Sequence, residues 1–319
     1  MNRPQMAVID PKSGVWQGRE ITGELYARFV ADLDAKPRTV QTYTGALRQL
    51  KGYFSLKNIT RPRREDILAF RDMLRESHKP TTVQSYITAA RLFFRWLEQE
   101  GIYPNIAERV KGAKLDKQHK KDYLTSAQIK AVMEIVDRRT VQGLRDYAIL
   151  ALMVTGGLRT IEVVRSDIAD LRSIGSYPVL FIQGKGEDEK AEYIRLDPRV
   201  EKAVRDYLKT RTDAGSELEQ TDPLFVSTSN NNAGDRLTTR SISGIVKERL
   251  RNAGYDSDRL TAHSLRHTAV TLSLLAGKRL EEVQQFARHA SITTTQIYNH
   301  ALDRAKNDCS AAIAEEIFS

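Results

Sequence analysis

An eight-residue segment that occurs twice near the start of this 319-residue chain constrains the fold more than any other feature. Residues 36–43 read KPRTVQTY and residues 79–86 read KPTTVQSY, so six of eight positions are identical at an offset of 43. In both copies a proline stands where the first turn of a helix tolerates a missing N–H. The repeat therefore predicts two similarly built helices that begin at Pro37 and Pro80.

Apolar residues follow each copy at the spacing of one helix face. They are Val40, Tyr43, Leu47, Leu50 and Phe54, and then Val83, Tyr86, Ala90, Phe93 and Leu97. A similar pattern begins at Thr22, and another covers residues 64–76. Gly101 is a plausible C-cap for the helix that begins at Pro80. These segments predict a four-helix domain over residues 21–110. Residues 1–20 lack periodicity and predict an extended arm.

Polar side chains gather in the first turns of the two repeated helices. They are Arg38, Thr39, Gln41, Thr42, Thr81, Thr82, Gln84 and Ser85. Helix N-termini and short polar side chains suit contacts with phosphates and groove edges. We therefore expect these residues to bind DNA, the alternative being two helices that share a capping pattern by chance.

The excess positive charge of the chain, +9 in total, lies in its N-terminal third. Residues 1–120 hold 22 Lys and Arg against 13 Asp and Glu, whereas residues 121–319 hold 28 of each. A basic domain beside a neutral one indicates that the first supplies much of the attraction to phosphates, although a merely soluble basic surface also fits. The basic segment 111–122 is interpreted as an interdomain linker that can also lie along a DNA backbone.

Residues 123–319 predict a second, mixed domain that is mainly helical with a small sheet. Helical patterns cover about 125–137, 142–154, 198–209 and 239–252, and the segments 180–183 and 192–196 predict a β-hairpin around residues 184–190. A single cysteine, Cys309, and the lack of a long apolar run or an apolar leader predict a cytoplasmic protein without a membrane partner. We find no phosphate-binding glycine loop and no convincing metal-ligand cluster, so no cofactor is expected.

Six residues of the second domain could together perform chemistry on a phosphate. Arg159 stands on a turn after an apolar helix, and Lys185 lies in the expected hairpin; the others are His263, Arg266, His289 and Tyr298. Cations bind a phosphate, a histidine moves protons, and a tyrosine hydroxyl can attack phosphorus. These residue types in this order therefore predict a nucleic-acid phosphodiester as the substrate.

The same residues carry a family resemblance. The series Gly-Leu-Arg159-x-x-Glu162, Gly-Lys185-Gly, His263-x-Leu-Arg266-His267, His289 and Thr-x-x-x-Tyr298 resembles the tyrosine recombinase (phage integrase) family. The helical domain before it resembles the core-binding domain of that family. The resemblance implies a helical core-binding domain followed by a mixed α/β catalytic domain with a C-terminal exchange helix.

The resemblance also implies the roles of the residues. Arg159 and Arg266 would hold the non-bridging oxygens of the scissile phosphate, and Tyr298 would attack phosphorus to give a 3′-phosphotyrosine and a free 5′-hydroxyl. Lys185 would act as the general acid toward the departing 5′-oxygen. His263 would handle the proton of the tyrosine and support the phosphate.

Further positions complete the comparison with the family pattern. His289 would donate a hydrogen bond to the phosphate, Glu162 would orient the site, and His267 is interpreted as structural. Two positions depart from the pattern, because Arg288 stands where the family commonly has glycine and Gly156 where a larger residue is usual. Arg288 could add a phosphate contact or change the local packing.

The expected function is that of a site-specific DNA recombinase acting on double-stranded DNA as a homotetramer, with accessory DNA-bending proteins as possible partners. The short segment before the first helix favours a compact integrase of a mobile element, and a Xer-type resolvase is the alternative. A type IB topoisomerase and a noncatalytic DNA-binding regulator are less favoured. The apolar tail 307–318 could dock on a neighbouring protomer or, equally, on its own domain.

Overall fold

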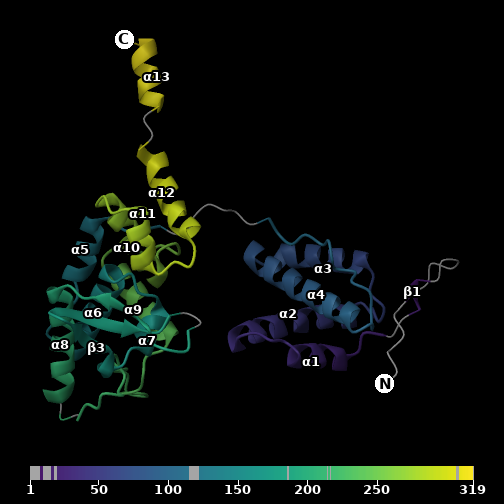
Figure 1. Ribbon diagram of the computed structural model, residues 1–319, viewed down its shortest axis with the longest axis horizontal. Coiled ribbons are helices and arrows are strands. Elements are labelled where there is room, and N and C mark those ends of the chain that lie inside the picture. Colours follow the sequence, from purple (N-terminus) through teal and green to yellow (C-terminus); the bar gives the residue numbers. More distant parts are fainter. Residues whose placement is uncertain are drawn as a thin grey trace. The chain divides into compact units, whose positions relative to one another are not determined.

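The protein consists of two compact units, residues 1–117 and residues 118–319, which are described separately (Figure 1). The computed structural model describes residues 8–9, 16–17, 20–114, 122–184, 187–213, 215, 217–306 and 309–318. The division between the units falls within the basic segment 111–122. The chain is mainly helical with a small antiparallel sheet, which confirms the predicted fold class.

The N-terminal unit is built from four helices, namely α1 (Gly23–Ala31), α2 (Pro37–Leu56), α3 (Arg64–Ser77) and α4 (Pro80–Gln99). As the repeat predicts, α2 and α4 both begin at proline. Phe93 lies at the centre of the core, where its ring stacks on Tyr26 at 4.6 Å and meets the edge of Phe29 at 5.5 Å. Apolar and aromatic packing therefore holds the helices that present the polar first turns.

Two short strands, β1 (Val8–Ile9) and β2 (Trp16–Gln17), pair antiparallel within the segment expected to be an extended arm. These four residues are extended backbone that is paired as a small ladder, which the sequence did not predict. The remainder of residues 1–19 lies outside the described residues.

The sheet of the second unit has three antiparallel strands in the order β3 (Leu171–Ile174), β4 (Tyr177–Ile182) and β5 (Glu192–Arg195). The expected hairpin is the β4–β5 pair, in which Leu180 lies opposite Ile194. The strand β3 was not predicted because three of its four residues are exposed and its apolar signal is weak. One face of the sheet, including Leu180, Ile182 and Ile194, joins the hydrophobic core.

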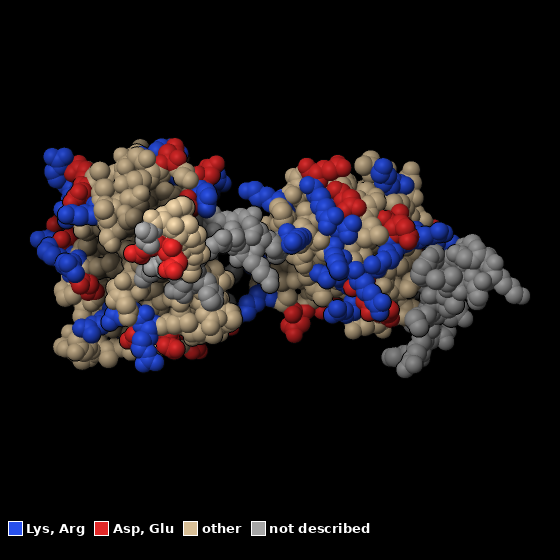
Figure 2. Space-filling model, turned by 90° about the horizontal axis from the view of Figure 1, so that it is seen from above, with Lys and Arg blue, Asp and Glu red and all other residues tan. Residues whose placement is uncertain are grey.

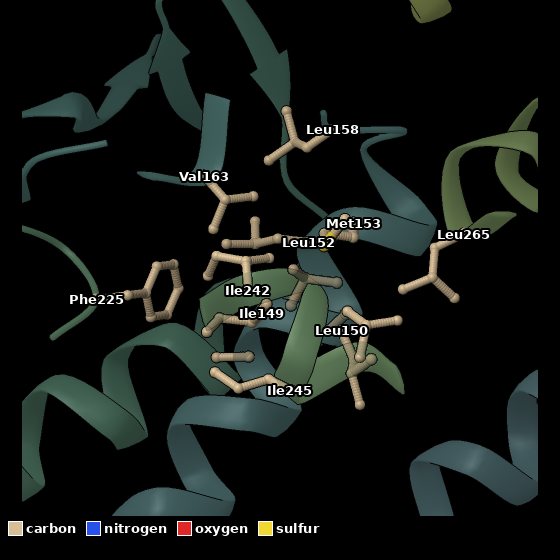
Figure 3. Close-up of a cluster of buried hydrophobic side chains, with 14 of the residues drawn as sticks. Ile149, Leu150, Leu152, Met153, Leu158, Val163, Phe225, Ile242, Ile245 and Leu265 are labelled. Atoms are coloured by element: carbon tan, nitrogen blue, oxygen red, sulfur yellow. The ribbon is translucent and has the colours of Figure 1, made fainter. Parts of the chain in front are cut away.

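Helix α6 (Val141–Thr155) forms the centre of the second unit (Figure 3). Its residues Ala148 to Met153 are all buried, as expected of a helix that is apolar on every side. Helices α8 (Pro198–Asp213), α9 (Thr239–Asn252) and α10 (Ala262–Leu275) pack around it. Because α6 is enclosed, the turn that follows it at residues 156–159 has a rigid support.

The remaining elements frame this turn and carry the C-terminal residues. They are α5 (Ser126–Glu134), α7 (Thr160–Arg165), the 3₁₀ helix η1 (Ile168–Asp170), α11 (Leu280–Ala287), α12 (Ile292–Lys306) and α13 (Cys309–Phe318). A capping box begins α5, because Thr125 and Gln128 exchange side-chain to backbone hydrogen bonds of 2.8 and 3.3 Å. Over the part of the chain that the structure describes, no helix is long and apolar enough to cross a membrane.

Candidate active site

Arg159 lies at the start of α7, directly after a tight turn. The turn depends on Gly157, whose φ of +57° favours glycine and whose added Cβ would lie 3.2 Å from Cε1 of Phe286. The buried carboxylate of Glu162 accepts hydrogen bonds from the Arg159 backbone N–H at 2.8 Å and from its Nη1 at 2.7 Å. Glu162 therefore fixes both the start of the helix and the direction of the guanidinium.

Arg266 lies on α10 and is almost fully buried, with 2% of its surface exposed. Its guanidinium donates to the carbonyl oxygen of Gly157 at 2.6 Å and to that of Ala287. Burial, followed by the neighbouring charges of Arg159 and Arg288, lowers the pKa of Arg266 to about 10. The group is still a cation at neutral pH, and an anion placed beside it would relieve the repulsion among the arginines.

Tyr298 lies on α12 with only 9% of its surface exposed. Burial raises the pKa of its hydroxyl to about 12, while the charge of Arg266 acts in the opposite direction. The hydroxyl is therefore protonated at neutral pH, and it forms a hydrogen bond with Nδ1 of His267. Such a tyrosine becomes a nucleophile only when a base takes its proton or cations stabilise its anion.

The neighbour of the tyrosine hydroxyl differs from the expected one. The family resemblance implied that His263 handles the proton of Tyr298, and His267 was expected to be structural. In the structure the exposed His263 ring meets the buried His267 ring edge-on at 4.5 Å, and the His267 ring lies 5.2 Å from that of Tyr298. The two histidines are one helical turn apart, so their spacing could have suggested that they act together.

His289 follows α11 and lies against the same tyrosine. Its ring stacks on Tyr298 at 6.2 Å with an angle of 16° between the planes, and its Nδ1 lies 2.9 Å from the hydroxyl of the buried Thr295. Burial and the charges of Arg266, Arg159 and Arg288 lower the pKa of His289 to about 4. The imidazole is therefore neutral at physiological pH. Sequence reasoning did not single out Thr295, which fixes one ring nitrogen.

A cleft of about 1120 Å³ opens beside these residues. Its lining includes Arg159, Arg288 and His289. An acidic rim, defined here as Glu187, Asp188, Glu189, Glu192 and Glu281, lines the cleft as well. Lys185 lies outside the described residues, but Gly184 and Glu187 on either side of it both line the cleft. Within the described ranges, no group of three His, Cys, Asp or Glu could hold a metal ion.

The DNA-binding residues expected in the N-terminal unit lie in the first turns of α2 and α4. Arg38 donates to Gln41 at 2.9 Å, and the hydroxyls of Thr42 and Ser85 return to backbone carbonyls one turn earlier. Arg38, Gln41, Thr42 and Thr81 are exposed, and Thr39, Thr82, Gln84 and Ser85 are exposed or half-buried. In Figure 2, Lys and Arg form a band over one face of this unit, with patches of Asp and Glu beside it.

Comparison with known proteins agrees with this geometry. A family model described as "Phage integrase family" matches residues 122–305, and one described as "Phage integrase, N-terminal SAM-like domain" matches residues 27–101. The tyrosine recombinase XerC of Herpetosiphon aurantiacus is 32% identical over 292 residues, which are 90% of this chain and 88% of that protein. The tyrosine recombinase XerD of Lacticaseibacillus casei is 32% identical over 73% of this chain and 77% of its own.

Solved structures share the fold. The XerH recombinase bound to palindromic difH substrate superposes with a TM-score of 0.70 at 22% identity, covering 86% of this chain and 80% of that one. The Tn1549 transposon integrase in complex with transposon right end DNA gives a TM-score of 0.68 at 20% identity, covering 93% and 99%. The family expected from the sequence is confirmed: the chain belongs to the phage integrase family, and it is a tyrosine-type site-specific DNA recombinase that cleaves and rejoins DNA.

Proposed function

We propose that the protein cleaves one strand of duplex DNA by attack of Tyr298 on a phosphodiester, which leaves a 3′-phosphotyrosine and a free 5′-hydroxyl. The observation that carries this proposal is the burial of the Tyr298 hydroxyl against His267, in contact with a site that also holds Arg266 and His289. A single protonated tyrosine with an adjacent base and nearby cations has what phosphoryl transfer needs.

The first role we propose is that of the arginines. Arg159 and Arg266 bind the two non-bridging oxygens of the scissile phosphate and neutralise the charge that develops in the transition state. In the structure Arg266 donates to two backbone carbonyls, and phosphate oxygens would compete with these as stronger acceptors. The neutral His289 keeps one ring nitrogen on Thr295 and offers the other to the phosphate.

The proton steps follow from the neighbours of the reacting atoms. As the bond from the Tyr298 oxygen to phosphorus forms, His267 accepts the phenolic proton, and the exposed His263 passes it to water. As the bond from phosphorus to the 5′-oxygen breaks, Lys185 protonates that oxygen. The phosphotyrosine is again a diester, so the reverse reaction with a 5′-hydroxyl reseals the strand without an external energy source.

We further propose that four protomers assemble on two DNA sites and exchange strands in pairs, in the cytoplasm and with DNA-bending proteins as possible helpers. The Xer names of the relatives favour a Xer-type role, while the transposon integrase among the solved structures keeps a mobile-element role as the second candidate. In α13 the side chains of Ile313, Ile317 and Phe318 are 59%, 66% and 85% exposed, which supports docking of this helix on a neighbouring protomer.

Covalent capture from a random pool tests the reaction and finds the target sequence in one experiment. Wild-type protein would be mixed with nicked duplexes of random sequence, in which loss of a short fragment after cleavage prevents resealing. We expect covalent adducts that survive denaturing electrophoresis, and the captured DNA to converge on inverted repeats about a short spacer. Tyr298→Phe is the matched control because it removes only the hydroxyl, and adducts that persist in it would exclude Tyr298 as the nucleophile.

A further inference from the structure

The two positions that depart from the family pattern, Gly156 and Arg288, contact each other in the structure. Nη1 of Arg288 donates to the carbonyl oxygen of Gly156 at 3.4 Å, although 132 positions separate the two residues. Arg288 has φ 52° and ψ 49°, in the left-handed region that favours glycine. An arginine at such a position carries a backbone strain that glycine would avoid, and the contacts of its side chain offset that strain.

We propose that Arg288 is a positioning residue that holds Glu162, and through it Arg159, in the geometry of the phosphate site. This inference rests on the proposed function of Arg159. The Arg288 side chain is only 7% exposed, and its Nη2 donates to Oε2 of Glu162 at 2.9 Å and to the carbonyl oxygen of Gly157 at 3.2 Å. In return, the backbone carbonyl of Arg288 accepts a hydrogen bond from Nη2 of Arg159 at 3.3 Å.

These contacts join segments that would otherwise be independent. Arg288 also donates to the carbonyl oxygen of Phe286 at 2.9 Å, so one guanidinium connects the end of α11 with the turn that precedes Arg159. His289 is the next residue in the chain. The position of Arg159 and the position of His289 are therefore set by the same side chain.

The charge balance of the site gives Arg288 a second effect. Glu162 is fully buried and accepts hydrogen bonds from both Arg159 and Arg288. With Arg266 nearby, three guanidinium groups lie around one buried carboxylate, and the exposed carboxylate of Glu192 lies 3.9 Å from Nε of Arg288. Because solvent screens Glu192 and not Glu162, a bound phosphate would face a net positive charge. Without Arg288, Glu162 would cancel a larger share of the charge of Arg159 and Arg266, which bind the phosphate in the proposed mechanism.

Gly156 makes room for this arrangement. A Cβ at this position would lie 2.4 Å from Cδ1 of Ile194 and 2.9 Å from the carbonyl oxygen of Leu152. Its φ of −93° is open to any residue, so the requirement is space and not backbone conformation. The absence of a side chain lets the turn lie against β5, where its two carbonyls meet the guanidinium of Arg288.

The variants Arg288→Gly and Arg288→Lys test the inference in the full-length protein. The first keeps the left-handed backbone and removes the guanidinium, and the second keeps the charge but loses the planar fork. Asn58→Gly is the matched control, because Asn58 has φ 53°, is exposed and lies in the other unit. Cleavage rates would be measured on nicked duplexes obtained by covalent capture, with either the natural phosphodiester or an uncharged methylphosphonate at the cleavage site.

We expect Arg288→Gly to fold but to melt below wild type, because the loss of a buried ion pair outweighs the relief of the left-handed backbone, whereas Asn58→Gly should melt at or above wild type. At a temperature where all variants are folded, Arg288→Gly should cleave the phosphodiester about 10- to 100-fold more slowly. The deficit should shrink on the methylphosphonate, which has no negative charge for the site to neutralise. Arg288→Lys should cleave at an intermediate rate. A merely structural role would slow both substrates equally.

Wild-type cleavage of the phosphodiester by Arg288→Gly would overturn the inference, and so would an equal deficit on both substrates. Failure of the proposed function is distinguishable, because wild-type protein would then form no adduct that depends on Tyr298.

Discussion

The two units of the protein differ in how exposed their expected functional side chains are. In the N-terminal unit the expected DNA contacts are polar groups at the starts of α2 and α4, exposed or half-buried over an aromatic core. In the second unit Arg266, His267 and Tyr298, to which we assign the chemistry, are themselves buried. The first arrangement adds many small attractions, whereas the second concentrates its effect in a few groups.

Burial explains why the unit with the excess positive charge is not the unit that holds the proposed active site. An exposed lysine or arginine attracts a phosphate at long range but is screened by salt and water. A buried arginine is worth more to a transition state because the surrounding dielectric is low, but it must be supported by hydrogen bonds. The net charge of zero over residues 121–319 therefore does not conflict with a strongly cationic site. We expect the following changes to distinguish residues that bind DNA from residues that cleave it, and we give them in order of decreasing effect.

The largest effect is expected from Arg159→Lys and Arg266→Lys. Lysine keeps the charge but lacks the planar fork that can bind two oxygens and donate to two carbonyls. Cleavage should fall by about 10²- to 10³-fold, which is the usual cost of losing one transition-state donor. DNA affinity, measured on the same duplex, should change little. A parallel loss of DNA affinity and cleavage rate would mean that these arginines act in DNA binding, like the polar residues of the first unit, and not in catalysis.

Substitution of the two histidines of α10 should slow cleavage by a comparable or smaller factor, and by a different factor for each. Because His267 contacts the Tyr298 hydroxyl, His267→Ala should slow adduct formation by about 10²-fold, the lower end of the range for general base catalysis. His263→Ala should lose less, since water can reach His267 once the exposed ring is removed. Single-turnover rates of the two variants decide the order. If His263→Ala is the slower variant, His263 is the residue that accepts the proton of Tyr298, and His267 has only a packing role.

His289 should make the stability of the second unit depend on pH. Its pKa is about 4 in the folded protein and 6.5 when unperturbed, so the neutral imidazole is favoured by folding. The stability contribution is fully present above pH 6.5 and is lost as the pH falls toward 4, because the unfolded chain binds a proton that the folded site resists. Melting temperatures at about pH 7.5 and about pH 5 should therefore differ less in His289→Gln than in wild type. An unchanged difference would mean that His289 titrates normally.

The smallest effect concerns the salt dependence of DNA binding. Isolated residues 1–118, which carry the excess positive charge, should show a steeper decrease of log K with log[salt] than isolated residues 121–319. Each phosphate neutralised adds about 0.9 to this slope. Titration of both fragments against one duplex measures it. A steeper slope for the catalytic fragment would show that its clustered arginines also dominate the grip.

Local signals in the sequence were sufficient for most of the fold. The repeated Lys-Pro segments mark the starts of α2 and α4, and the helix expected at 239–252 has those bounds. The strand β3 escaped prediction because it has little apolar periodicity of its own and is ordered by pairing with β4. Its existence depends on a neighbour and not on its own residues.

The site was predictable as a set of residues but not as a set of contacts. The ordered motifs indicated Arg159, His263, Arg266, His289 and Tyr298, and their proposed roles rest on the geometry described above. The bond between Tyr298 and His267 and the one between Arg288 and Gly156 join residues that are 31 and 132 positions apart. Such pairs follow from the packing of α10, α11 and α12 with one another and with the turn after α6, which a linear pattern does not encode.

The acidic rim of the cleft has a consequence for DNA that does not carry the target sequence. The rim places five carboxylates in the same cleft as Arg159, Arg288 and His289, so a DNA backbone that approaches this cleft meets negative as well as positive side chains. Entry then requires the additional binding energy of a correct sequence. We expect the rim to weaken the entry of nonspecific DNA into the cleft and so to favour cleavage at the correct sequence.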